Sequence, residues 1–574
     1  MKKNALFFLF VLLQNIDITF AKAPINIFHS GSAIEVGQKD DLALLCRIWG
    51  MLKYHHPAVI QGTYNWDQEL ITILPTYSAN KNKAERNEIL LKWVSNFGPV
   101  PQTPPIADSL LANAKLKPDY TWIGKSKLSP QLVNLLISVS NFHSSGDQKY
   151  VKYLADDDIV IPSFINEDGY TQMTYPTADY RLLAVFRYWN IIEYWYPYKY
   201  LTKQKWEDCL IPFINEALAA QDELAYTHLI QKMAGTIQDS HAVVNFKKSD
   251  EYNGMWVMPF TVKFIEDKAV VNSVNPKAPE AASIKIGNII QAIDGIPVEK
   301  IVENKKPYLS ASNQAVVLRE TAKLLNRSCD STSKLSIKNN DGETLLLTVK
   351  NSHYSPYTIV KAYDFAYQKD STTFILPENV LYINAGTFKA TQVDLVKQQL
   401  KKVKGLVLDA RQYPRTGAGS VISLLQKLLL ADKAPMSKFS SNVKGYPGLF
   451  IFSKPFIIGE ANADYYKGKV MILVNEETQS TSEFLTMAYQ LAPNAMVVGS
   501  LTAGADGNVT YPFTLPGGFT TQITGLGVYY PNGKETQQVG IVANVKVKQT
   551  ITGFRNHKDD LLDKAVEVIV NKMD

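Results

Sequence analysis

The feature that most constrains this chain is a strand, turn, helix, strand pattern at residues 469–504. Five consecutive apolar residues at 470–474 predict a buried strand, and a helix is expected to open within the run TQSTSE at 478–483. A helix N-terminus offers unpaired backbone N–H groups and the positive end of the helix dipole, and both stabilise developing negative charge. A strand that delivers the Ser480 hydroxyl there can present a nucleophile. The alternative is that Ser480 only caps the helix, with Glu483 completing a capping box.

Length and composition bound the possible classes of protein. The 574 residues are too many for one hydrophobic core, so roughly two to four domains are expected. The formal net charge of +6 is small for this length and includes no long basic run, which argues against nucleic-acid binding. The three cysteines, Cys46, Cys209 and Cys329, lie far apart and predict neither a disulfide framework nor a metal site. Cys46 and Cys209 lie in apolar contexts typical of buried thiols.

The N-terminal residues 1–23 have the pattern of a secretory signal peptide. Two lysines precede an apolar run at 5–13, and the sequence AKA at 21–23 supplies the small residues of a cleavage site. The apolar run is too short for a comfortable membrane span, although an uncleaved anchor is the alternative. We therefore expect an exported protein, periplasmic or extracellular, with no stable membrane span after cleavage.

An internal repeat occupies the N-terminal half. The run LCRIW at 45–49 recurs as VFRYW at 185–189, 140 residues later, and apolar residues in both copies recur at helical spacing. This pattern predicts two related helical units. The first unit and its linker, which includes a Pro-rich stretch at 99–118, occupy residues 38–175, and the second occupies residues 178–250. Their aromatic residues could line a peptide groove, but packing between helices is the favoured role.

Residues 254–350 change character, because short strand patterns replace the helical spacing. An apolar strand at 270–274 precedes the small-residue run PKAPEAA at 276–282, a Gly turn, a second strand and an Asp-Gly turn at 294–295. This order resembles the core of a PDZ domain, which binds an extended chain end at a sheet edge. A generic small β domain is the alternative.

Residues 353–574 alternate predicted strands and helices, which implies a layered α/β core. The strands are expected at 380–383, 405–408, 470–474 and 496–498, with a helix at 392–402.

A serine nucleophile needs a base, and one of the eight histidines stands out. His241 closes the second helical unit and opens an apolar run, and Asp239 and Ser240 precede it directly. An ordinary surface histidine is the alternative interpretation.

Three motifs in a fixed order resemble the C-terminal processing peptidase superfamily, with the tricorn-like branch as the closer match. They are DSH at 239–241 before the PDZ-like region, the helix start at 478–483, and VGSLTAG at 498–504. The resemblance covers most of residues 178–550. The fold class that we expect is a multidomain α+β protein with duplicated helical units, a PDZ-like β domain and an α/β catalytic core of the crotonase-like ββα type.

The resemblance implies a role for each matching residue. Ser480 would be the nucleophile, and the backbone N–H of Thr481 would bind the oxyanion. His241 would be the general base, and Ser240 would help to orient its imidazole. The processing peptidases use a Lys base where this chain has Ala505, so a Ser-Lys dyad is not expected.

Two positions depart from the family pattern. The second oxyanion donor is expected shortly after Asp409 and Arg411, where Arg415 stands in place of a glycine and its backbone N–H is the candidate donor. The family's remaining acid position holds Gln537. Glu535 lies two residues away, on the same face of a strand, and is the candidate substitute.

The sequence therefore predicts an exported serine peptidase whose substrates are peptides or proteins, with the substrate chain end held by the PDZ-like domain. No metal or organic cofactor is implied. A catalytically weak or inactive peptide-binding protein on the same scaffold is the alternative, and the two departures favour it. A carbohydrate-binding protein would leave the Ser480 and His241 motifs unexplained. The oligomeric state and the cleavage preference are not predicted.

Overall fold

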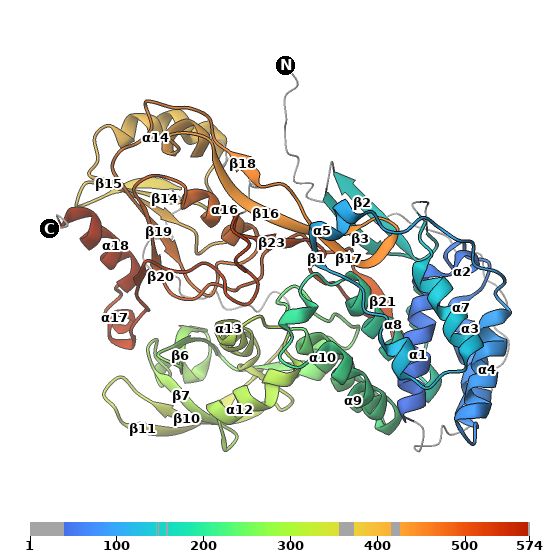
Figure 1. Ribbon diagram of the computed structural model, residues 1–574. Coiled ribbons are helices and arrows are strands. Elements are labelled where there is room, and N and C mark those ends of the chain that lie inside the picture. The colour runs from blue at the N-terminus through green and yellow to red at the C-terminus, as the bar shows by residue number, and fades with distance from the viewer. Residues whose placement is uncertain are drawn as a thin grey trace.

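A computed structural model describes residues 39–144, 146, 148–156, 159–354, 372–414 and 425–571 (Figure 1). The fold is mixed α+β and multidomain, as expected, with most of the helices at the right of Figure 1, the small β domain at the lower left and the α/β core above that domain. The predicted signal peptide and Arg415 lie outside the described residues. Within the described parts of the chain, no helix is long and apolar enough to cross a membrane.

The helical half contains both copies of the repeat. Its first part comprises α1 (Lys39–His55), α2 (Pro57–Ile60), α3 (Trp66–Ser78), α4 (Lys83–Ser95), α5 (Asp108–Ala112), β1 (Ala114–Leu116), α6 (Trp122–Lys125), α7 (Pro130–Asn141), β2 (Val151–Asp156) and β3 (Ile159–Phe164). Its second part comprises α8 (Ala178–Trp195), α9 (Trp206–Ala219), α10 (Glu223–Thr236) and α11 (Ser249–Asn253).

The two copies pack in the same way around paired tryptophans. The Trp49 and Trp66 indoles each donate to the other residue's carbonyl at 3.1 Å. Trp189 and Trp206, each 140 residues further on, make the same reciprocal bonds at 3.2 and 3.1 Å. Both ring pairs are stacked, and all four side chains are buried. The favoured core-packing role of the aromatic residues is therefore confirmed, and the buried positions of Cys46 and Cys209 agree with their prediction.

A buried ion-pair network links the two copies. Lys53 of α1 lies 2.6 Å from Glu167, and Arg187 of α8 lies 2.8 Å from the other oxygen of Glu167. Arg187 also pairs with Asp67 of α3 at 2.7 Å and donates to the Thr514 carbonyl in the C-terminal part of the chain. These four charges balance, and Asp67 and Arg187 come from different copies of the repeat, on α3 of the first and α8 of the second.

The small β domain has a six-stranded antiparallel sheet in the order β11-β10-β7-β6-β5, with β8 paired to β7. The predicted strand at 270–274 falls within β6. The elements are β4 (Trp256–Val257), β5 (Phe260–Ile265), β6 (Lys268–Val274), β7 (Ile289–Ile293), β8 (Ile296–Pro297), α12 (Val298–Lys305), α13 (Gln314–Leu324), β9 (Arg327–Ser328), β10 (Thr332–Lys338), β11 (Thr344–Lys350) and β12 (Ser352–His353).

The α/β core is built on a second six-stranded sheet in the order β13-β14-β15-β19-β20-β24, parallel except for β13. Alternate residues of β19 face two layers: Val470 and Ile472 pack towards α14 and α16, and Met471 and Leu473 pack against α18. The elements are β13 (Thr373–Leu376), β14 (Val380–Asn384), α14 (Val393–Leu400), β15 (Gly405–Asp409), β19 (Lys469–Val474), α16 (Thr481–Tyr489), β20 (Ala495–Gly499), β24 (Val545–Lys546), α17 (Ile551–Arg555) and α18 (Asp560–Val570).

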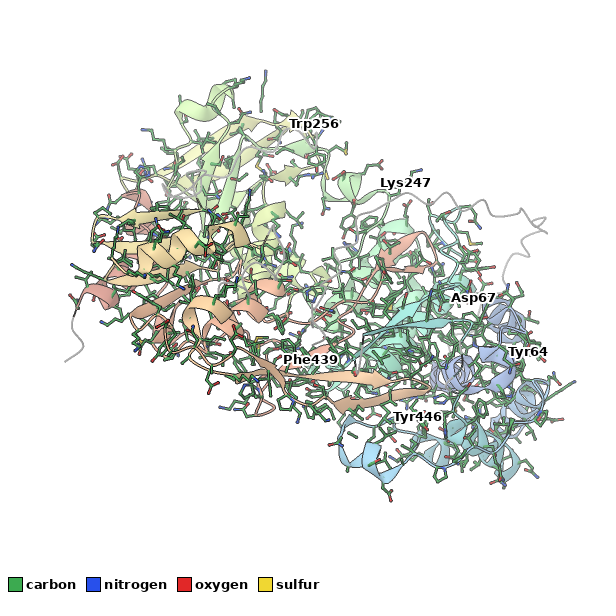
Figure 2. All side chains as sticks on the ribbon, turned by 90° about the horizontal axis from the view of Figure 1, so that it is seen from above. Tyr64, Asp67, Lys247, Trp256, Phe439 and Tyr446 are labelled. Atoms are coloured by element: carbon green, nitrogen blue, oxygen red, sulfur yellow. The ribbon has the colours of Figure 1, made fainter. Side chains whose placement is uncertain are left out.

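A long antiparallel arm joins the α/β core to the helical half. Figure 2 shows it running from Phe439 to Tyr446, whose ring stacks on His143 at a centroid distance of 4.3 Å. Strand β1 pairs with its edge. The strands of the arm are β16 (Ala434–Val443), β17 (Tyr446–Phe452), β18 (Phe456–Ile458) and β23 (Gly527–Tyr529). β21 (Phe513–Leu515) and β22 (Phe519–Thr521) pair with each other in a separate two-stranded sheet.

Candidate active site

Strand β19 delivers Ser480 to the N-terminus of α16, as the sequence predicted. Ser480 is the residue before the first helical position and has φ 54° and ψ −119°, a backbone conformation that a residue with a side chain rarely adopts. Its own N–H donates to the Ala505 carbonyl at 3.0 Å. Within the described residues, the next N–H, that of Thr481, donates no hydrogen bond, so it is available at the positive end of the helix.

Glu483 fixes the loop after β20 against this helix start. Its carboxylate accepts the N–H of Ser480 at 3.2 Å, so the backward half of the predicted capping box is present. It also accepts the Thr502 hydroxyl at 2.5 Å and the N–H groups of Gly504 and Ala505 at 2.7 and 3.0 Å. Burial raises the pKa of Glu483, and these four donors oppose that rise. The side chain thus joins the nucleophile candidate to loop 502–505.

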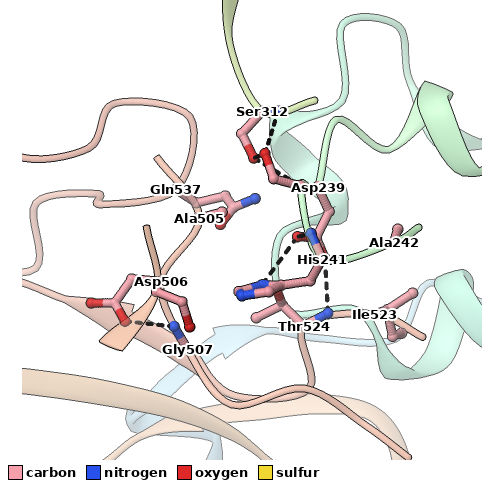
Figure 3. A network of polar contacts seen from close by, with 12 residues as sticks. Asp239, His241, Ala242, Ser312, Ala505, Asp506, Gly507, Ile523, Thr524 and Gln537 are labelled. Carbon is pink, nitrogen blue, oxygen red and sulfur yellow. Dashed lines mark hydrogen bonds and ion pairs between the residues drawn. The ribbon is translucent and has the colours of Figure 1, made fainter. Parts of the chain in front are cut away.

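His241 lies in a buried polar cluster (Figure 3). Its Nδ1 atom lies 3.0 Å from the Thr524 hydroxyl and 3.5 Å from a carboxylate oxygen of Asp239. That carboxylate also accepts the backbone N–H groups of His241 and Thr524, at 3.0 and 2.8 Å. Four interactions therefore fix the ring and the backbone around it.

Ser240 does not contact the imidazole through a hydrogen bond. Its hydroxyl lies 2.8 Å from the Ser312 hydroxyl and accepts the Ser312 N–H at 3.0 Å. The neighbouring Asn313 donates to the carbonyls of Thr502 and Ala503. In this structure Ser240 therefore attaches the His241 segment to the small β domain, and that domain in turn holds loop 502–505.

The two candidates for the third catalytic group lie in different surroundings. Glu535 accepts the Tyr200 hydroxyl at 2.6 Å and pairs with Lys115 at 3.0 Å. Gln537 is fully buried, and its amide donates to the Gln238 carbonyl at 3.4 Å, directly before the Asp239–His241 segment. Of the two, Gln537 is thus the one that hydrogen-bonds to the segment leading to His241.

Ser480 and His241 share no direct hydrogen bond in the described parts of the chain, but both border the segment 502–507. Ser480 contacts it through the Ala505 carbonyl. From the histidine side, the Gln538 N–H donates to the Gly504 carbonyl at 2.7 Å. In the view of Figure 3, the His241 imidazole points away from Thr524 and towards the side on which Ala505 and Asp506 lie.

Asp506 adds a second buried carboxyl group to this segment. One of its oxygens accepts the Gly507 N–H at 2.7 Å, and the other has no hydrogen-bond partner among the described residues. Burial, together with the nearby Glu483 charge, raises the pKa of Asp506 well above its usual range. The proton therefore stays on this carboxyl at higher pH than on an exposed aspartate.

The loop after β15 begins with a buried ion-pair cluster. Arg411 donates to both Asp409 and Asp559 at 2.7 Å, and the Tyr382 hydroxyl donates to Asp409. The Thr478 hydroxyl donates to the Ala410 carbonyl at 3.1 Å, which ties this loop to the turn before Ser480. The loop that the sequence predicts to carry the second oxyanion donor therefore starts next to the nucleophile candidate.

Sequence reasoning missed three residues that hold the site together. Asp239 lies two residues before His241 in the sequence, but no motif assigns it a role. Thr524 and Ser312 approach from 283 and 72 residues away, in segments without a catalytic motif. No local sequence pattern predicts contacts between residues so far apart in the chain.

Comparisons with known proteins bear on the identity of the chain. Residues 379–547 match the model of Peptidase family S41. The chain is 25% identical over 346 residues to a carboxyl-terminal-processing protease of Picosynechococcus sp., covering 59% of this chain and 73% of that relative. The solved structure of mature CPAF is 14% identical to this chain, and that of mature CPAF complexed with lactacystin is 13% identical. Each has a TM-score of 0.52. Each match covers 68% of this chain and 97% or 98% of the CPAF chain, and supports the fold alone.

The family match falls on the segment that contains β14, β15, β19, α16 and β20, where the sequence motifs had placed the catalytic core. The chain is thus similar to a C-terminal processing protease, and its residues 379–547 match Peptidase family S41.

Proposed function

We propose that this protein is an exported serine peptidase that hydrolyses peptide bonds with Ser480 as nucleophile and His241 as general base. The observation that carries the proposal is the strained backbone of Ser480 between β19 and α16, next to the Thr481 N–H, which donates no hydrogen bond within the described part of the chain. Strained backbone is retained where the surrounding structure enforces it, and such positions cluster at active sites. The match to a peptidase family supports the same reaction class.

The proposed reaction begins when the Ser480 hydroxyl attacks the scissile carbonyl carbon. His241 accepts the hydroxyl proton at Nε2 and returns it to the leaving amine as the C–N bond breaks. The Thr481 N–H and the helix dipole stabilise the oxyanion, and the backbone N–H of Arg415 is the proposed second donor. Water then hydrolyses the acyl-enzyme by the reverse proton transfers. Removing one oxyanion donor from such a site costs about 10²–10³-fold in rate.

The other parts of the chain have supporting roles in this proposal. Residues 254–350 act as a PDZ-like domain that holds the substrate chain end, and residues 38–175 and 178–250 form one wall of the cleft. Residues 353–574 form a crotonase-like ββα core. Residues 1–23 direct the chain to the periplasm or the extracellular space and are then removed. The apolar edge strand β5 and the adjacent α13 support peptide addition at the sheet edge.

Fluorophosphonate labelling of the mature protein tests the proposal. We expect one adduct, mapped to Ser480 by peptide mass spectrometry, and its loss in the Ser480→Ala and His241→Ala variants. Ser482→Ala is the matched control, because Ser482 is the next serine along the same helix and donates instead to the Gln412 carbonyl. Labelling that survives Ser480→Ala would overturn the assignment of the nucleophile.

An inactive peptide-binding protein on the same scaffold is the second candidate. Gln537 in place of an acid favours it, as does the missing direct hydrogen bond between Ser480 and His241 among the described residues. Absence of labelling in the wild type, together with saturable binding of peptides to residues 254–350 within the full chain, would establish this candidate instead.

A further inference from the structure

We infer that Asp239 is the residue that positions His241 as the base, in place of an acid at position 537, where this chain has Gln. The inference rests on the proposed function and names the third member of the same site. It rests on three contacts that converge on one carboxylate: the imidazole Nδ1, the His241 N–H and the Thr524 N–H.

The geometry decides which ring nitrogen carries the proton. The Asp239 carboxylate oxygen lies 3.5 Å from Nδ1, and the Thr524 hydroxyl oxygen lies 3.0 Å from the same atom. A fixed negative charge beside Nδ1 favours the tautomer with its proton there, because the N–H dipole then points at the carboxylate. Nδ1 donates that proton to Thr524, and Nε2 keeps a lone pair for the serine hydroxyl.

Asp239 is also in the right charge state to stabilise the imidazolium that forms. Burial alone would raise the pKa of Asp239, but the nearby His241 side chain and the two backbone N–H donors outweigh burial and hold the pKa below its usual value. The carboxylate is fully buried, so its charge is poorly screened by solvent. A buried anion held by backbone donors is the electrostatic partner that Gln537 does not supply.

The other acidic groups nearby are occupied elsewhere. Glu535 pairs with Lys115 and accepts the Tyr200 hydroxyl. Glu483 accepts four donors from the helix start and loop 502–505. Burial raises the pKa of Asp506 well above its usual range, which disfavours its charged form, and one of its oxygens accepts the Gly507 N–H. Among these acids, Asp239 is the one with an atom within 4 Å of the imidazole.

The test compares Asp239→Asn with the wild type by two independent readouts. The first is the second-order rate constant of fluorophosphonate labelling. We expect it to fall about 10²–10⁴-fold, as happens when the aspartate of a Ser-His-Asp triad is replaced by asparagine. The second is the ¹⁵N spectrum of protein labelled only at histidine, with His241 assigned by comparison with His241→Gln. We expect the ring proton on Nδ1 in the wild type and on Nε2 in a large share of Asp239→Asn molecules.

Two further variants separate positioning from stability. Asp67→Asn removes a different buried, paired carboxylate, so it should reduce stability while leaving the labelling rate and the His241 spectrum unchanged. Thr524→Val removes the hydroxyl at Nδ1 but keeps the Asp239 charge, so the Nδ1 proton should persist. Should Asp239→Asn fail to fold, a Thr524→Val protein with the proton on Nε2 would overturn the inference.

The inference is also overturned if Asp239→Asn labels at the wild-type rate with the wild-type ring spectrum. Failure of the proposed function gives a different result. A wild type that is not labelled would refute the peptidase assignment, and the ring spectrum would still report whether Asp239 fixes the tautomer of His241.

Discussion

Two carboxyl groups and one histidine, each buried, determine the chemistry at the scale of single residues. The His241 side chain and two backbone donors hold the pKa of Asp239 below its usual value. Burial and the Glu483 charge raise the pKa of Asp506, one of whose oxygens has no hydrogen-bond partner among the described residues. Their environments move the two pKa values in opposite directions, a pattern that marks functional sites. Neither direction follows from the sequence, in which both residues are aspartates followed by a small residue.

Asp506→Asn should change how stability depends on pH. Folding raises the pKa of Asp506, so its contribution to stability is present below the unfolded pKa of about 3.9 and is lost as pH rises through the folded value. Asn has no proton to lose, and it keeps an acceptor for the Gly507 N–H. The melting temperature of Asp506→Asn, relative to the wild type, should therefore increase steadily between about pH 5 and pH 8. A pH-independent difference would contradict the assignment.

The site residues that the sequence could predict are those in local motifs. Ser480 and Thr481 follow from a strand that precedes a helix start, and the structure places both there. The contacts of His241 could not be predicted, because Thr524 reaches it from 283 residues away. Ser240 was expected to orient the imidazole, and it instead hydrogen-bonds to Ser312 of another part of the chain. Arg415 lies outside the described residues and remains a prediction.

At the scale of elements, the close approach of β19 and β20 positions the turn that carries Ser480. Gly499 ends β20 with φ 143°, and a Cβ added there would lie 1.9 Å from the Val474 carbonyl oxygen. The Val474 carbonyl also accepts the Ser500 N–H, so moving β19 away from β20 would break this hydrogen bond. A glycine is therefore required one strand away from the nucleophile candidate.

Gly499→Ala should destabilise the protein and displace the helix start. We expect a loss of roughly 2–4 kcal/mol from strain and overpacking, measured by urea unfolding, together with slower fluorophosphonate labelling. Gly124→Ala is the control, because no atom lies within 4 Å of its added Cβ and it sits in α6. An equal stability for the two variants would show that β19 and β20 tolerate separation.

Strands with continuous apolar runs were predictable, whereas the β16 and β17 arm was not. The predicted strands at 380–383, 405–408, 470–474 and 496–498 fall within β14, β15, β19 and β20. In β16, the fully or almost fully buried residues Ser437, Ser440 and Asn442 interrupt the apolar pattern. Two of them find partners in other segments, since Ser440 donates to Tyr529 and Asn442 donates to the Leu449 carbonyl, whereas the Ser437 hydroxyl has no hydrogen-bond partner among the described residues. Those partners cannot be read from local sequence.

At the scale of the whole molecule, a buried charge network joins the helical repeat to the C-terminal part. Arg187 contacts Asp67, Glu167 and the Thr514 carbonyl, so one side chain links both copies of the repeat to the segment that leads to Thr524. Removing one partner of a buried pair leaves uncompensated charge, which costs more than the pair itself contributes.

Arg187→Met should cost about 3–5 kcal/mol of stability, because it leaves the buried Asp67 carboxylate without its cation and leaves Glu167 with Lys53 alone. The repeat offers its own control in Arg47, which occupies the matching position 140 residues earlier. Arg47 lies 5.5 Å from the Trp189 ring centroid, and no ion pair involves it in the described residues, so Arg47→Met should cost about 0.5–1 kcal/mol. Thermal unfolding of both variants provides the comparison, and similar losses would refute the role of the network.

The central claim is peptide-bond hydrolysis by Ser480, and digestion of a complex peptide mixture tests it most directly. Purified mature wild type and Ser480→Ala would each be incubated with the same peptides, and new chain ends would be identified by mass spectrometry. The account predicts a defined set of cleavages by the wild type and none by Ser480→Ala. Identical peptide patterns for the two proteins would contradict it.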